Sequence, residues 1–242
     1  MNNLIKWELK QTFKSKAFWG FAAFYMFSAL LLFVDISGDD SKTMYDAFLV
    51  NMNNTNAFFT LTLGVFCGIH FAGAFEDRKV QAAIMAGSSR MNIIVSKLLS
   101  FSIVMTIYSV LALGIGSIIS YVSFKEAGVD SWMTPVAQSL IFTFAWVALA
   151  SICFIISMLV KKVGAAIAIN VGILLVSNTV AQLVMEKELG FKICKCTPIG
   201  QTLLSITNTS RADITTSVVA SGIGLLLTAV AAFIIFRRTE LK

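Results

Sequence analysis

The sequence is poor in charged residues and in proline. Only 13% of its 242 residues are charged, and it holds two prolines and one histidine, whereas about 25% of residues are charged in soluble domains. The low proline count excludes a proline-rich chain, and the high apolar content excludes intrinsic disorder. Apolar residues make up 57% of the chain. The composition therefore predicts a membrane protein without a soluble domain of ordinary size.

The four cysteines predict neither a disulfide framework nor a metal site. Cys67 and Cys153 lie within apolar runs, and Cys194 and Cys196 form a C-x-C pair that lacks the companion ligands of a zinc site. The chain also has no H-E-x-x-H and no G-x-S-x-G motif, so the groups of a zinc or serine protease are incomplete. We expect free thiols, no catalytic residue and no metal.

Six apolar runs are long enough to cross a bilayer, which takes about 20 residues of helix. They lie at residues 17–36, 56–75, 93–123, 135–160, 163–185 and 214–236. The first run exceeds the apolar core of a signal peptide and has no small-x-small cleavage site after it, so we expect a retained anchor. The predicted fold is an all-α membrane protein, with a helix over residues 1–16 and a six-span domain over residues 17–242.

Most of the 19 lysine and arginine residues lie on one side of this arrangement, the side that holds both chain ends. Cytoplasmic loops carry an excess of lysine and arginine, so both termini are predicted to be cytoplasmic. The net charge of +6 then orients the chain and contacts anionic membrane lipid. We expect no nucleic-acid partner.

The segment before the first span has the pattern of an amphipathic helix. An apolar row runs beside a row of lysines, with the members Ile5, Leu9 and Phe13 next to Lys6, Lys10 and Lys14. This pattern predicts a helix that lies in the cytoplasmic membrane interface. The alternative is that these lysines only satisfy the topology rule.

The segment between the second and third runs, residues 76–90, is too long for a plain turn. Val80, Ala83, Ile84 and Gly87 fall on one helical face, at i, i+3, i+4 and i+7. The segment therefore predicts a short amphipathic cytoplasmic helix that ends at Gly87. Such a helix rests on lipid or binds a groove on another protein.

The run Q-A-A-I-M-A-G-S-S-R-M-N-I-I-V-S-K, residues 81–97, resembles a segment of bacterial ABC-2 type permeases. In that family a short helix precedes a G-x-S-R turn and the I-x-x-S-K that opens span three. Residues 7–19, W-E-L-K-Q-T-F-K-S-K-A-F-W, are similar to the family's interfacial helix, and F-R-R-T-E-L at 236–241 resembles its basic ending. Many members carry Gly-Thr where this chain has Arg78-Lys79.

The resemblance implies that the helix between spans two and three is a coupling helix that fits a cleft on a separate ATP-binding subunit. The residues expected to contact this ATPase are Asp77, Arg78, Gln81, Ile84, Met85 and Arg90. The alternative is a helix that packs only on its own spans. This chain has no G-x-x-x-x-G-K-[ST] motif, so ATP and Mg would be bound by the partner. The chain is not expected to be an enzyme by itself.

Polar residues within the spans are candidates for a translocation path. Asn170, Asn178 and Gln182 lie near one helical face of the fifth run, where they would line a path or donate hydrogen bonds to a neighbouring helix. For His70, the only histidine, we expect a hydrogen-bond donor between helices and not a proton relay or a ligand. Gly64, Gly68 and Ala72 repeat at four-residue steps, a pattern that permits close helix approach.

The resemblance further implies a bacterial cell membrane exporter in which two permease chains, identical or related, form the route between them. It also implies short external helices within residues 186–213. The G-S-S-R sequence looks most like peptide-export and lantibiotic-immunity relatives, which suggests an amphipathic peptide as cargo. The alternatives are a lipid or drug exporter and a self-powered channel or secondary transporter. The last would normally need intramembrane acids, and the cores of the six runs contain none.

Overall fold

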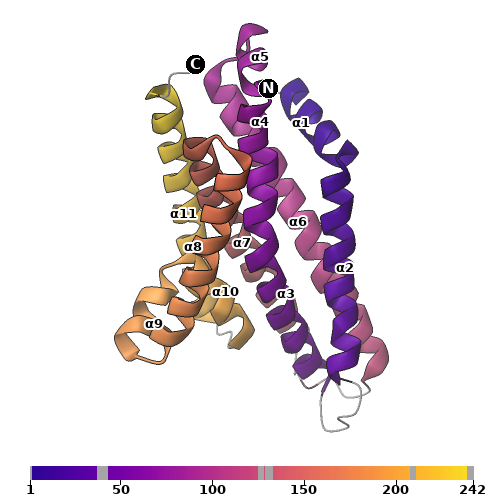
Figure 1. The fold of residues 1–242 in the computed structure, drawn as a ribbon. Helices are drawn as coiled ribbons and strands as arrows, with labels where there is room; N and C mark the ends of the chain where they lie inside the picture. The colour runs from indigo at the N-terminus through magenta and orange to yellow at the C-terminus, as the bar shows by residue number, and fades with distance from the viewer. Residues whose placement is uncertain (1, 37–42, 125–127, 129–132, 208–210, 239–242) are drawn as a thin grey trace.

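The computed structural model describes residues 2–36, 43–124, 128, 133–207 and 211–238 (Figure 1). Within this part of the chain every regular element is a helix and there is no strand. In chain order the helices are α1 (Asn2–Lys14), α2 (Lys16–Ile36), α3 (Met44–Cys67), the π-helix η1 (Gly68–Ala72), α4 (Gly73–Glu76), α5 (Lys79–Met85), α6 (Arg90–Ser123), α7 (Met133–Val160), α8 (Val163–Met185), α9 (Glu188–Lys195), α10 (Pro198–Thr207) and α11 (Arg211–Arg238). Residues 239–241 of the predicted basic ending lie outside the described residues.

Five stretches of the described residues are long and apolar enough to cross a membrane. They are Met44–Glu76, Arg90–Ser123, Met133–Val160, Val163–Met185 and Val218–Ile235. The prediction of an all-helical fold with several membrane-spanning candidates is thereby confirmed for the described residues, and these stretches match the second to sixth predicted runs. Residues 17–36 form α2, which is helical as predicted but is not among the five.

The helix that contains the second predicted span begins earlier in the chain than predicted from the sequence. It starts at Met44, not at residue 56, because Thr43 and Asp46 form a capping box. The Asp46 N–H donates to Thr43 Oγ1 at 3.2 Å, and the Thr43 N–H donates to Asp46 Oδ2 at 3.0 Å. Asn51 and Asn56 interrupt the apolar pattern after this cap, yet both side chains are buried between helices.

The glycines of α3 and η1 bring this long helix against α8. A Cβ on Gly64 would lie 2.7 Å from the backbone nitrogen of Val171, and one on Gly68 would lie 3.0 Å from that of Ile167. Only glycine permits such contact between helix backbones. The predicted close helix approach is confirmed, and it occurs within the chain.

Aromatic rings fill the centre of the bundle between α2, α3, α6 and α7. The Tyr25 and Phe59 ring centroids are 4.4 Å apart, and Phe59 lies 5.1 Å from Trp146. The Tyr108 hydroxyl, from α6, donates to the Phe18 carbonyl of α2 at 3.0 Å. In a bilayer, such packing and hydrogen bonding hold helices together.

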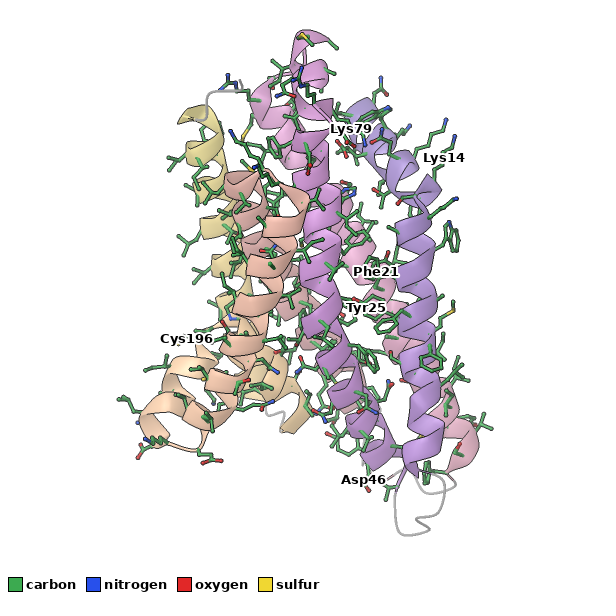
Figure 2. The ribbon with its side chains drawn as sticks, viewed as in Figure 1. Lys14, Phe21, Tyr25, Asp46, Lys79 and Cys196 are labelled. Atoms are coloured by element: carbon green, nitrogen blue, oxygen red, sulfur yellow. The ribbon has the colours of Figure 1, made fainter. Side chains whose placement is uncertain are left out.

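The two ends of the bundle differ in charge and in structure. The beginning of α1, the end of α11 and the whole of α5 lie at one end, and α9 and α10 lie at the other (Figure 1). The first end, called here the basic end, carries lysines and arginines from several helices and turns, among them Lys6, Lys10, Lys14, Arg78, Lys79, Arg90, Lys161 and Lys162. The start of α3 with Asp46 belongs to the opposite end (Figure 2). The described part of segment 186–213 includes the short helices α9 and α10, and short helices were expected there.

Candidate functional site

A helical hairpin forms the tip of the basic end. The long membrane helix ends at Glu76, and Arg78 then takes a φ of 56°, a left-handed conformation that favours glycine. The seven-residue helix α5 follows, and Gly87, with a φ of 87°, leads into the Ser89 cap of α6. A short helix is thus present within residues 76–90, as predicted.

One face of α5 packs on the bundle and its end projects beyond it (Figure 1). Val80 is buried, and Ala83 and Ile84 pack half-buried against the same core. Met85, at the end of the helix, exposes 83% of its surface. An exposed methionine at the tip of a projecting helix is a surface suited to contact with another protein.

The predicted ATPase-contact residues are divided between these two environments. Asp77, Arg78, Met85 and Arg90 are exposed, whereas Gln81 and Ile84 are half-buried. Asp77 Oδ2 and Lys79 Nζ form an ion pair at 2.7 Å with both side chains about half exposed, which contributes little to stability. The structure brings all six predicted residues to one hairpin, and Ile84 also packs on the chain's own helices.

The hairpin is tied to α8 by a capping contact that the sequence did not suggest. The Glu76 carboxylate oxygen Oε2 accepts the Val163 backbone N–H at 2.9 Å. This bond satisfies one of the donors that a helix leaves free at its first turn. The base of the hairpin therefore contacts the beginning of α8 directly and leads through Ser89 into α6.

A buried ion pair joins α1 to α6. Lys97 Nζ lies 2.9 Å from Glu8 Oε1 and 3.1 Å from Glu8 Oε2, and the two side chains are 8% and 4% exposed. In the sequence analysis Lys97 appears only as the last residue of the segment 81–97, and no partner is predicted for it. Two features of the sequence could have predicted the pair: Glu8 is a single glutamate in a lysine-rich amphipathic helix, and Lys97 is a single lysine at the start of an apolar run.

The ion pair fixes which face of α1 is turned inward. Glu8 and Thr12 are buried against the bundle, while Ile5 and Leu9 are half-buried beside them. Phe13 lies nearer the surface, with its ring edge-on to Phe18 at 4.9 Å. The predicted apolar residues of α1 therefore lie beside the buried polar residues Glu8 and Thr12, which make the contact with the bundle.

Two hollows lie between α1 and the helices of the hairpin. The first, of about 480 Å³, is mainly apolar and is lined by Leu4, Trp7, Ala82 and Ala83 among others. The second, of about 390 Å³, reaches from α1 to η1 and the start of α6 and is called here the polar hollow, because most of the residues that line it are polar or charged although its surface also includes apolar groups. Lys79 borders both.

The three predicted path residues of α8 differ in their surroundings. Asn170 is buried and its Nδ2 donates to Ser157 Oγ of α7 at 2.9 Å, so this amide connects two helices. Asn178 is half-buried and Gln182 is exposed. Gln182 shares its side of α8 with Gly164, because the two positions are separated by about five full turns.

The cysteines are free thiols, three of them buried and Cys196 exposed. Burial raises the pKa of the Cys194 thiol, which lies in α9 outside the candidate spans. Among the described residues, no group of histidine, cysteine and carboxylate side chains could hold a metal ion. His70 stacks on Phe66, with centroids 5.7 Å apart, and borders the polar hollow.

Comparison with known proteins adds a family match. A family model described as "Protein of unknown function (DUF2705)" matches residues 11–241. This range begins within α1 and includes the hairpin, α8 and the whole of α11. No curated protein matches the chain.

Proposed function

This chain belongs to the family described as "Protein of unknown function (DUF2705)", and we propose that it is the membrane subunit of an ATP-binding cassette exporter. In this proposal a separate ATPase chain binds ATP and Mg, and two permease chains form the translocation path. The observation that carries the proposal is α5, a short helix that projects from the basic end with Met85 exposed at its tip.

We assign α5 the role of the coupling helix. A coupling helix must offer side chains to a partner and also transmit the partner's motion to the spans. Met85 and Arg90 are exposed for the first task. For the second, the base of the hairpin is bonded to α8 through Glu76 and Val163 and continues into α6.

We assign α2 as a sixth span. Its 21 residues would extend about 31 Å at 1.5 Å per residue, close to the thickness of a bilayer core. It runs beside α3 and α6 along the bundle (Figure 1). With six spans both termini lie on the side of α5, and the lysines and arginines at that end make it cytoplasmic.

A second permease chain would contact the outer face of α8. Gly164, Ala168 and Gly172 are exposed there, and a Cβ on either glycine would meet no atom within 4 Å. Small residues spaced in this way allow a second helix to approach closely. Gln182 is exposed on the same helix, and an amide facing lipid is unfavourable without a partner. The partner is a copy of this chain or a related sibling.

The proposed cargo is an amphipathic peptide, and a lipid or a drug is the alternative. A path along α8 would offer the amides Asn178 and Gln182 beside exposed apolar residues such as Val176 and Leu183. A mixed lining of this kind suits a cargo with both polar and apolar faces.

A self-powered transporter is the second candidate, and one observation favours it. The Glu8 and Lys97 pair is a buried charge pair of the kind that ion coupling uses. It joins α1 to the beginning of α6, at the end of the bundle, whereas coupling sites of secondary transporters lie near the bilayer midplane. This position favours the ATP-driven exporter.

The test compares two exposed apolar residues at opposite ends of the protein. Met85→Asp should lower the amount of co-purifying ATPase at least tenfold, because it places a charge in the proposed contact. Leu189→Asp in α9 is the matched control, since Leu189 is 72% exposed, and should leave co-purification unchanged. Equal ATPase recovery with both variants, at equal folded yield, would refute the coupling role of α5.

A further inference from the structure

The polar hollow of about 390 Å³ lies where α1 meets the membrane helices of the basic end. Buried Glu8 and Lys97 form part of its wall, and the exposed residues Gln11 and Lys14 border it. Lys14 and Lys79 lie at the same end of the bundle in Figure 2. The volume falls within the range of small-molecule sites, roughly 300–1,000 Å³.

The charges around the hollow leave one positive charge unbalanced. Lys97 is paired with Glu8, and Lys79 is paired with Asp77. Lys14 has no such acidic partner among the ion pairs of the described residues. One unbalanced lysine matches a ligand that carries one negative charge, whereas a dianion would bring two negative charges to a single uncompensated cation.

The hollow also offers hydrogen-bond donors in addition to Lys14. Ser15 Oγ accepts the Ala17 N–H at 3.2 Å, which leaves its own proton to donate. The Gln11 amide and the His70 ring border the same space. Together with the lysine ammonium, these groups suit the several acceptor oxygens of a phosphate ester.

We propose that this hollow binds a phosphodiester monoanion, and that its source is the headgroup of an anionic membrane lipid. A phosphodiester carries one negative charge, whereas inorganic phosphate and phosphomonoesters approach two near neutral pH. The site lies where α1 ends at Lys14 and the apolar helix α2 begins, the level at which lipid headgroups meet a span. A bound headgroup would connect α1 to the π-helix across the hollow.

The test uses the full chain, purified in detergent and stripped of lipid. The probes are short-chain phosphatidylglycerol, phosphatidylcholine of the same chain length, the deacylated diester glycerophosphoglycerol, and inorganic phosphate. Binding is followed by titration calorimetry. The variant is Lys14→Gln, and the control is Lys10→Gln, an exposed lysine of the same helix that does not line the hollow.

We expect phosphatidylglycerol to bind at least tenfold more tightly than phosphatidylcholine. Lys14→Gln should weaken it about tenfold, and Lys10→Gln should not. Equal binding of glycerophosphoglycerol and the lipid would support the diester site and assign it a soluble source. Equal binding of the two lipids, or an equal loss with both variants, would overturn the proposal, as would a preference for inorganic phosphate.

This inference does not depend on the proposed transport function. Lys14 lies in α1, away from the exposed tip of α5. Lys14→Gln should therefore leave ATPase co-purification unchanged, while Met85→Asp should leave lipid binding unchanged. Failure of one proposal can thus be told apart from failure of the other.

Discussion

Replacing Glu8 with leucine should destabilise the protein by about 3 kcal/mol. Removing one partner of a buried ion pair costs about 3–5 kcal/mol, because the other charge stays buried without compensation. Lys97 contacts both carboxylate oxygens of Glu8, at 2.9 and 3.1 Å, and its side chain is 8% exposed. The pair borders a hollow, so water can reach Lys97 in part, which places the expected cost at the lower end. A change of this size is roughly a hundredfold in the folding equilibrium.

The double variant Glu8→Leu with Lys97→Met separates charge burial from packing. It removes both charges, and replacing a buried pair with apolar groups is often close to neutral. Lys97→Met alone should cost about as much as Glu8→Leu, since it leaves the buried carboxylate unpaired. We expect the double variant to be within about 1 kcal/mol of the wild type, which corresponds to a coupling energy of about 5 kcal/mol between the two positions. The measurement is reversible unfolding in mixed micelles as the fraction of a denaturing detergent is increased, with the loss of helix monitored by circular dichroism.

The reasoning would be refuted if Glu8→Leu changed the free energy of unfolding by less than about 0.5 kcal/mol, the ordinary range of a surface substitution. It would equally be refuted if the two single effects simply added in the double variant. Either result would mean that the pair is solvated and does not hold α1 against α6.

Three further predictions concern packing, thiol chemistry and the outer face of α8. Gly64→Ala should destabilise the protein by about 1–3 kcal/mol, because the added Cβ would lie 2.7 Å from the backbone of α8. The control Gly73→Ala should be nearly neutral, since its Cβ would meet the nearest side chain at 3.6 Å. Thermal unfolding compares the two variants, and equal effects would contradict the close approach of α3 and α8. Cys196 is exposed and should react with a membrane-impermeant maleimide in intact cells. Cys194 should react more slowly, and its reaction rate should rise only at higher pH, because burial raises the pKa of its thiol. Equal rates and pH profiles in single-cysteine variants would contradict the burial. Gln182→Leu should lower transport or dimer yield without lowering thermal stability, and an unchanged export rate and dimer fraction would remove α8 from the path and the interface.

The long apolar helices could be predicted from the sequence because run length alone determines whether a helix can span a bilayer. The short helix α5 was predictable for a different reason. Its apolar face repeats at helical spacing, and Gly87 supplies the positive φ that the turn into α6 requires. Both features depend on residues close together in the chain.

The features that sequence reasoning missed depend on contacts between distant residues. The polar stretch around Asn51 and Asn56 resembles a loop, yet both side chains are buried in α3. Glu8 and Lys97 are separated by 89 positions, and only the packing of α1 on α6 brings them together. The role of Asn170 was left open between a path residue and an interhelical donor, and its bond to Ser157 provides the second of these contacts.

The most direct test of the central claim is gentle purification of the tagged chain from its native host, followed by mass spectrometry of its stoichiometric partners. The proposal predicts a co-purifying protein with a G-x-x-x-x-G-K-[ST] motif, at one ATPase chain for each permease chain. An intact dimer that purifies without such a protein would contradict the ATP-driven exporter and make the self-powered transporter the leading explanation.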